Sequence, residues 1–277
     1  MKKLTIVALA AIMVSPFMSK ADEGMWLPML IKRLNYADMQ KHGLQLTADE
    51  IYSVNNSSLK DAIVALNGGS CTAETISEKG LLLTNHHCAF GVIQDNSAPE
   101  HDYLMDGFWA MAMKEELNAR GMTASYLIEM RDVTSDLLTE ISITLSGEER
   151  QKAVSEATKA IQEKISGEVA EHYDVKIKEF YEGNEYYAFV YETYRDVRLV
   201  GAPPSSIGKY GGDTDNWMWP RHTGDFSLLR VYMGEDGKPA DYSETNKPYK
   251  PKHFLPVSIS GIDKDDYAMI MGYPGST

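Results

Sequence analysis

Gly80-Leu81-Leu82-Leu83-Thr84-Asn85-His86-His87-Cys88 is the stretch of this 277-residue chain that says most about its fold. Three leucines between a glycine and a Thr-Asn pair predict a short buried strand, and two histidines follow where that strand ends. A histidine at a strand end is held by a rigid element and can still face a cleft. Because imidazole titrates near neutral pH, this placement suits a general base. The stretch therefore predicts β-structure with a catalytic His87 at the end of a strand.

The residues around this strand are also typical of β-structure. Thr72 to Ile76 is its predicted hairpin partner, with a turn through Ser77-Glu78-Lys79-Gly80 in which glycine is free to take a positive φ. Further short strands are predicted over residues 62–66, 122–130, 175–180, 186–194, 197–200, 226–233 and 267–271. Helices are predicted over residues 29–41, 107–120 and 146–165. Many short strands separated by turns, with helices inserted between them, favour a mainly β barrel or sandwich.

A second informative stretch is Trp219-Pro220-Arg221-His222-Thr223-Gly224-Asp225-Phe226-Ser227-Leu228-Leu229-Arg230-Val231, in which an aspartate opens an apolar strand. An aspartate that orients a catalytic histidine must be fixed and partly buried so that it accepts the ring N–H. The start of a core strand provides such a position, and Asp225 is therefore the predicted partner of His87. Asp213 and Asp215 are rival candidates, although the glycine-rich loop that carries them suits the role less.

A zinc site is the alternative chemistry for the same histidines. His86, His87, Cys88 and His222 are all residue types that bind zinc. Adjacent histidines on an extended chain point in opposite directions, however, and the sequence has no His-x-x-x-His or Cys-x-x-Cys spacing. We therefore expect His86 to have a structural role, and we expect no metal or other cofactor to be needed.

The first residues have the composition of an export signal. Lys2 and Lys3 precede an apolar run from Leu4 to Val14, and Ser19-Lys20-Ala21 is typical of a cleavage site. The run is shorter than the about 20 apolar residues that span a bilayer. Residues 1–21 are thus predicted to be a signal peptide, with a buried N-terminal helix as the alternative. The mature protein is expected in the periplasm or at the outer surface, without a membrane span.

The cysteine count and the charge narrow the possibilities further. In an exported protein the two cysteines, Cys71 and Cys88, predict a disulfide, and two free buried thiols are the alternative. The formal net charge is -13, from 27 basic and 40 acidic residues. Such a surface repels phosphate groups, so neither nucleic acid nor an anionic membrane is an expected partner.

The two informative stretches together resemble the first barrel of chymotrypsin-like serine peptidases, in which a Thr-x-x-His-Cys segment precedes an aspartate and an aliphatic strand. Longer segments resemble the bacterial serine dipeptidyl-peptidases, the family that contains dipeptidyl-peptidases seven and eleven. The resemblance covers essentially the whole mature chain. It is carried by Asp22–Trp26, Thr84–Cys88, Val200–Gly208 and, most specifically, Asp213–Phe226.

This resemblance implies a double β-barrel with a helical domain inserted into it, and a His-Asp-Ser triad that releases dipeptides from the free N-terminus of peptides. His87 would be the base and Asp225 its orienter, while Asn216 and Trp217 would hold the substrate α-amino group. No cofactor is implied, and a homodimer is the oligomeric state expected from the resemblance. Residues 22–277 would be the N-terminal part of the peptidase domain, ending before the helical domain and the serine-bearing barrel.

A second class of function stays open beside the peptidase. Without a nucleophile the chain by itself is expected to be inactive, so a catalytically inactive exported module that binds peptides is the alternative. A serine in a Gly-x-Ser-Gly setting downstream of Thr277 would distinguish the two. The sequence makes no prediction about whether an apolar or an acidic residue precedes the cleaved bond.

Overall fold

The computed structural model describes residues 25–139, 141 and 144–274. The predicted signal peptide at residues 1–21 lies outside this part of the chain. Within it, no helix is both long enough and apolar enough to cross a bilayer.

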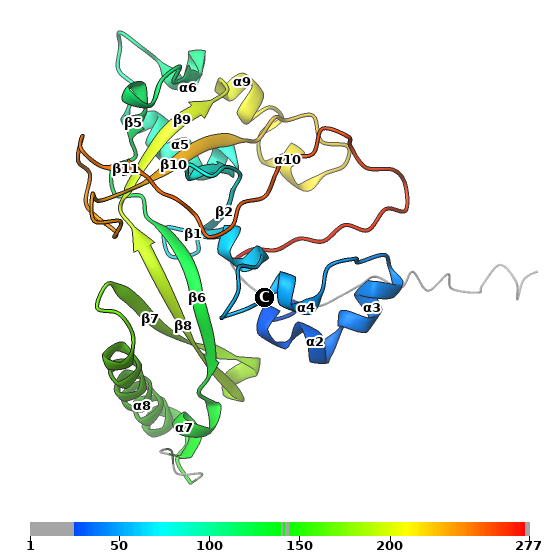
Figure 1. Cartoon of the computed structure of the whole chain (residues 1–277), viewed down its shortest axis with the longest axis vertical. Helices are drawn as coiled ribbons and strands as arrows, with labels where there is room; N and C mark the ends of the chain where they lie inside the picture. The colour runs from blue at the N-terminus through cyan, green and yellow to red at the C-terminus, as the bar shows by residue number, and fades with distance from the viewer. Residues whose placement is uncertain (1–24, 140, 142–143, 275–277) are drawn as a thin grey trace, which may run out of the picture.

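The main feature is an antiparallel sheet that curls into a barrel. Its strands follow the order β9-β10-β3-β2-β1-β6-β8, with the bounds β1 Ile63–Leu66, β2 Cys71–Thr75, β3 Leu81–Thr84, β6 Ala124–Asp132, β8 Glu185–Tyr194, β9 Asp196–Ala202 and β10 Ser227–Met233. Only Arg195 separates β8 from β9, so the two ends of this path are consecutive parts of the chain (Figure 1). The sheet therefore returns to its own starting point, and the predicted mainly β fold with helical insertions is confirmed.

The barrel interior is apolar because alternate residues of its strands face inward. Val64, Leu82, Leu199, Leu229 and Val231 are fully buried and belong to one cluster. Burying a side chain of this size stabilises a fold by roughly 1.5–3 kcal/mol. This core fixes the ends of β3 and β10, which are the two strands that lead to the predicted site residues.

The β2–β3 hairpin has the predicted turn, and one glycine in it is required. Gly80 has a φ of +63°, and a Cβ at this position would lie 3.0 Å from the carbonyl oxygens of Val231 and Tyr249. Only glycine takes such a conformation without strain. The residue therefore allows β3 to start close against β10, with which it pairs from Leu81 to Thr84.

A second layer is built on the β6–β8 strands where they extend beyond the barrel. β7 (Tyr173–Phe180) pairs with β8, and α7 (Thr134–Thr139) and α8 (Gly147–Glu168) pack on one face of the extension. α8, which lies where a helix was predicted, turns an apolar stripe toward this layer, with Ile161 and Ile165 buried. The opposite face is aromatic and is covered by the N-terminal segment, so that the short helices α2 (Ile31–Leu34), α3 (Tyr36–Lys41) and α4 (Ala48–Ile51) lie across the sheet from α8 (Figure 1).

The remaining elements are short. They are η1 (Pro28–Leu30), η2 (Leu59–Ala62), α5 (His86–Asp95), α6 (Tyr103–Asp106), β4 (Phe108–Trp109), η3 (Met113–Glu115), β5 (Leu117–Asn118), η4 (Tyr181–Gly183), α9 (Ser205–Gly208), α10 (Gly212–Trp217) and β11 (Lys247–Pro248). Thr47 and Glu50 form a capping box at the start of α4. Ser146 is the N-cap of α8, and its side chain makes no capping hydrogen bond.

Two predicted elements are wrong. Residues 107–120 do not form a helix, because β4 and β5 within this segment pair with β9 instead. Their alanine, methionine and glutamate residues favour helices, but that weak preference gives way to backbone pairing at the β9 edge. Residues 267–271 were predicted as a strand and have no regular structure. A strand is defined by its hydrogen-bonded neighbour, and no described strand pairs with this segment.

Candidate active site

His87 lies in the first turn of a helix, not at a strand end. β3 ends at Thr84, Asn85 is the N-cap, and α5 begins at His86. The prediction that His87 lies at the end of a strand is therefore wrong, because the chain passes from strand to helix within two residues. Successive residues of an α-helix point about 100° apart, given 3.6 residues per turn. His86 is therefore fully buried, whereas the His87 side chain is 55% exposed.

Asp225 lies against His87, just before β10 begins. Its Oδ2 is 2.7 Å from His87 Nδ1, and its Oδ1 accepts the backbone N–H of His87 at 3.1 Å. Asn85 donates from Nδ2 to Asp225 Oδ2 at 3.1 Å and to the Asp225 carbonyl at 3.2 Å. The carboxylate thus sits at the N-terminus of α5, where free N–H groups and the helix dipole favour negative charge.

This arrangement fixes which ring nitrogen of His87 is available. Nδ1 faces the carboxylate, so Nε2 is the nitrogen left to exchange a proton with another group. The Asp225 side chain is only 15% exposed, which shields its bond to the ring from water. An Asp–His pair of this geometry can act as the base and orienter of a triad. Asn85 was not singled out from the sequence, because its position before a helix becomes visible only once α5 is known to start at His86.

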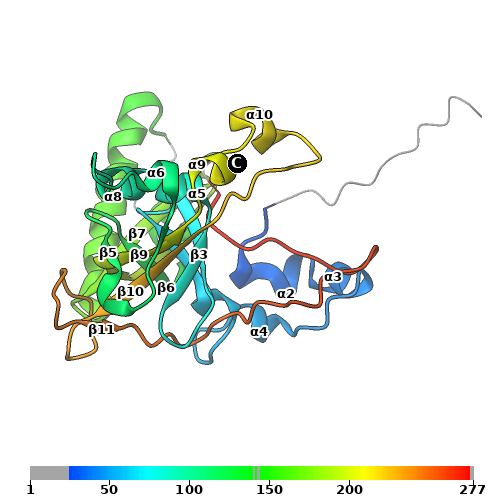
Figure 2. The same cartoon turned by 90° about the horizontal axis from the view of Figure 1, so that it is seen from above.

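The rival aspartate Asp215 has a different role. Its Oδ2 accepts the backbone N–H groups of His222 at 2.9 Å and Thr223 at 3.2 Å. The Ile207 carbonyl accepts from the Thr223 hydroxyl and from the Gly224 backbone N–H, both at 3.0 Å. These contacts close the loop between α9 and Asp225, and Figure 2 shows α9 beside α5 with α10 projecting beyond them.

Asn216 and Trp217 lie at the end of α10 in this loop. Asn216 is half-buried, and Trp217 is 82% exposed. Neither side chain hydrogen-bonds to His87 or Asp225 in the described structure, so their role in substrate binding stays a prediction. Trp219, two residues further on, is 88% exposed as well.

An aromatic pair beside Asp225 was not found from the sequence. Trp109 lies 6.2 Å from Phe226, measured between ring centroids, and both rings are partly exposed. Trp109 packs over Gly201, where a Cβ would come within 2.4 Å of the indole. Because residues 107–120 were predicted to be helical, the sequence gave no reason to place Trp109 next to β10.

His86, for which a structural role was predicted, is fully buried beside His87. Burial lowers the pKa of its ring, opposed by the nearby Asp225 carboxylate and the Pro203 carbonyl. The ring fits against Gly208 of α9, where a Cβ would lie 2.3 Å from the imidazole Cδ2. His86 therefore holds α9 against the first turn of α5, next to His87.

The Gly208→Ala variant is expected to lose about 1–3 kcal/mol of unfolding free energy, because the added methyl group overlaps the buried His86 ring. Denaturant unfolding measures the change. Gly91→Ala is the matched control: it lies in α5 with open space around it, and alanine there should stabilise the helix by about 0.5–1 kcal/mol. Equal effects of the two substitutions would contradict the packing of His86 on Gly208.

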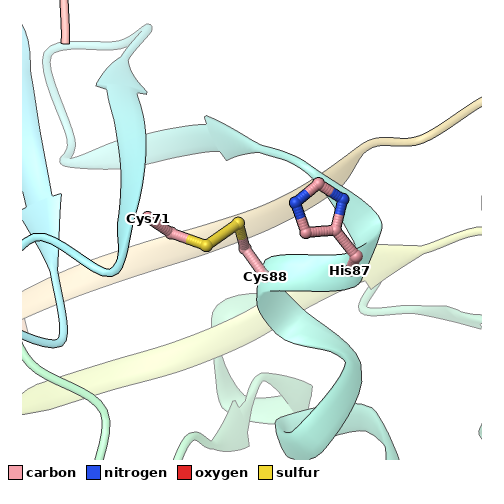
Figure 3. Close-up of side chains that lie close together, drawn as sticks. All are labelled: Cys71, His87 and Cys88. Carbon is pink, nitrogen blue, oxygen red and sulfur yellow. A yellow bond between two sulfur atoms is a disulfide. The ribbon is translucent and has the colours of Figure 1, made fainter. Parts of the chain in front are cut away.

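Cys71 and Cys88 form a disulfide, as predicted. Their Cα atoms are 6.1 Å apart, and the bond joins the start of β2 to the first turn of α5. Figure 3 shows His87 next to this bond. Cysteines in a disulfide offer no thiolate ligands, and His222 belongs to the loop closed by Asp215. The zinc set of His86, His87, Cys88 and His222 is therefore not assembled.

Replacing both Cys71 and Cys88 with serine is expected to lower the unfolding free energy by about 3 kcal/mol, since the disulfide closes a loop of 17 residues in the unfolded chain. Equilibrium denaturation of the variant and of the oxidised protein gives the difference. Reduced wild-type protein serves as the control and should resemble the variant. A variant as stable as the oxidised protein would show that the bond does not constrain unfolding.

Comparison with known proteins places this geometry in a family. The model of the family Peptidase S46 matches residues 21–277. The chain is 52% identical over 262 residues to a dipeptidyl-peptidase 7 of Capnocytophaga gingivalis, covering 95% of this chain and 36% of that protein. It is 50% identical over 254 residues to an Asp/Glu-specific dipeptidyl-peptidase of Flavobacterium psychrophilum, covering 92% of this chain and 35% of that protein.

A solved structure shows the same fold. The crystal structure of Porphyromonas endodontalis DPP11 in complex with the dipeptide Arg-Glu matches with a TM-score of 0.80 and 45% sequence identity, covering 88% of this chain and 36% of that one. The chain thus spans about a third of the length of these relatives. With the family model matching nearly all of it, the chain belongs to the peptidase S46 family.

Proposed function

We propose that this chain supplies the histidine and the aspartate of a serine dipeptidyl-peptidase that is exported from the cell. The observation that carries the proposal is the contact between His87 Nδ1 and Asp225 Oδ2 at 2.7 Å, with the carboxylate held by Asn85 and by the start of α5. The predicted signal peptide at residues 1–21 and the disulfide support export to an oxidising compartment such as the periplasm.

The chemistry follows from the free nitrogen of the ring. Nε2 of His87 takes the proton of a serine hydroxyl as its oxygen attacks the carbonyl carbon of the peptide bond. Asp225 accepts the Nδ1–H throughout and stabilises the imidazolium. The ring then gives its proton to the leaving amine, and the dipeptide stays on the serine as an ester. Water activated by His87 hydrolyses this ester, which releases the dipeptide and restores the serine hydroxyl. The serine comes from a part of the protein outside residues 1–277, in line with the greater length of the relatives.

Recognition of the substrate N-terminus is assigned to Asn216 and Trp217. Both lie in α10, on the loop that leads to Asp225 and whose Thr223 hydroxyl donates to the Ile207 carbonyl. The Asn216 amide can accept from an ammonium group, and the exposed Trp217 ring offers a face to a cation or to an apolar side chain. Relatives named for different specificities are about equally similar to this chain, so the proposal covers dipeptide release alone.

The test is to assay the full-length protein on paired fluorogenic dipeptidyl substrates, one with a free and one with an acetylated N-terminus. We expect cleavage of the free form only, because a blocked amine cannot bind as a cation. Substrates of one and three residues serve as controls and should be poor. Equal cleavage of both forms would contradict a dipeptidyl-peptidase. Binding of the free peptide without any cleavage would favour the inactive peptide-binding module.

A further inference from the structure

We propose that reduction of the Cys71–Cys88 disulfide turns the same corner of the molecule into a binding site for Zn²⁺, with Cys71, Cys88 and His87 as ligands. The two sulfurs and one ring nitrogen of His87 lie within 4.8 Å of one another. They come from the start of β2 and the first turn of α5, and Figure 3 shows the ring edge of His87 turned toward the disulfide. All three residues are at least partly exposed to solvent.

The geometry admits a tetrahedral ion. Zinc bound at about 2.3 Å from two thiolates holds the sulfurs about 3.8 Å apart. Cysteines whose Cα atoms are 6.1 Å apart reach that separation by side-chain rotation once the S–S bond is broken. Two thiolates and one imidazole are three protein ligands, which leaves the fourth position to water. Two cysteines and one histidine also hold the catalytic zinc of alcohol dehydrogenase.

Asp225 supports the zinc site, because it already lies where a carboxylate accepts the second ring N–H of a metal-binding histidine. Histidine ligands of metals commonly donate their other ring N–H to a carboxylate, which fixes the tautomer and makes the coordinating nitrogen more basic. Here Nδ1 of His87 faces Asp225 Oδ2 at 2.7 Å, which leaves Nε2 to coordinate. The contact with Asp225 that orients His87 for proton transfer therefore also orients His87 as a metal ligand.

The conversion is chemically balanced. A dithiol gives two electrons and two protons to the S–S bond and leaves as its own disulfide. Zn²⁺ then displaces the two thiol protons and binds the thiolates together with neutral His87. In the oxidised protein the sulfurs are bonded to each other, so only the reduced form has the site.

The ion would switch off the peptidase, and this consequence alone rests on the proposed function. Zinc on Nε2 occupies the lone pair that would take the serine proton. Loss of the disulfide and binding of zinc would thus act together, so that the enzyme works only where cysteines are oxidised.

Cobalt is the probe for the test, because its visible absorption reports four-coordinate geometry and its near-ultraviolet absorption reports thiolate ligands. The chain is reduced with a phosphine, which takes its oxygen from water and does not compete as a thiol, and is then titrated with Co²⁺. We expect one Co²⁺ per reduced chain, with thiolate and tetrahedral bands that Zn²⁺ abolishes. The oxidised chain should show neither band.

Substitutions separate this site from non-specific thiol binding. His87→Gln keeps both cysteines and should weaken Co²⁺ binding at least about tenfold and shift the visible bands. His222→Gln is the matched control, on the loop closed by Asp215, and should leave the titration unchanged. Identical spectra and affinities for His87→Gln and wild type would overturn the site, as would equal binding by the oxidised chain. Neither readout depends on peptidase activity, so failure here leaves the proposed function untouched.

Discussion

Replacing His87 with alanine in the full-length protein is expected to lower kcat for dipeptide release by about 10⁴-fold or more. In triads of this type the histidine, serine and aspartate act as a unit, and removal of the base leaves only the contribution of binding and of oxyanion stabilisation. The KM should change little, because the His87 ring is assigned no contact with the substrate amine. Steady-state kinetics on a free dipeptidyl substrate, with active-site titration to correct for inactive protein, measures the effect.

The control for His87→Ala is His42→Ala, which removes an exposed histidine that follows α3, among the N-terminal helices. It should retain wild-type kcat. The His87→Ala variant should also keep its fold, since the side chain is half exposed and the backbone bond to Asp225 survives the substitution. Near-wild-type turnover by a folded His87→Ala protein would remove His87 from the mechanism.

Replacing Asp225 with asparagine is expected to lower kcat by a similar factor of about 10⁴ for a different reason. The asparagine amide can donate to Nδ1, which favours the tautomer with hydrogen on Nε2, and that nitrogen then accepts no proton from serine. Asparagine also removes a negative charge from the N-terminus of α5, which should lower the unfolding free energy by about 0.3–1 kcal/mol. Kinetics and denaturant unfolding on the same preparation separate the two effects.

Asp215→Asn is the matched control, because it is the same substitution on a carboxylate that binds loop amides and does not contact the His87 ring. We expect it to raise KM, through the loop that carries Asn216 and Trp217, and to change kcat by less than about tenfold. The reverse pattern, with Asp215→Asn inactive and Asp225→Asn active, would make Asp215 the orienter.

The Gly208→Ala variant and the replacement of Cys71 and Cys88 with serine test the residues that hold the His87–Asp225 pair in place, which we call the frame of the pair. Gly208, His86 and the disulfide fix the first turn of α5 from two sides, from α9 and from β2. A catalytic base must be held to within a fraction of an ångström, and residues that never touch the substrate supply that precision. The packing of His86 on Gly208 accounts for the buried histidine directly before His87.

The sequence by itself determined the mainly β fold, most of the strands, and the partners His87 and Asp225. Local patterns suffice for most strands, because an apolar run between turn residues favours a buried strand. The pairing of His87 with Asp225 was predicted from the resemblance to serine peptidases as well as from these patterns. The disulfide was predicted from the cysteine count together with the predicted export signal. The catalytic roles of His87 and Asp225, and the substrate contacts of Asn216 and Trp217, are predictions that the kinetics above will test.

Only the tertiary structure decided how the pair is held. Residues 85–88 are too few for their pattern to reveal that a helix starts there. Asp225 follows His87 by 138 positions, and it reaches the N-terminus of this helix only because β10 pairs with β3. Trp109 comes beside Phe226 because β4 pairs with β9, against the helical preference of its own segment. Pairing between distant strands is set by the closure of the whole barrel, and a local pattern carries no information about it.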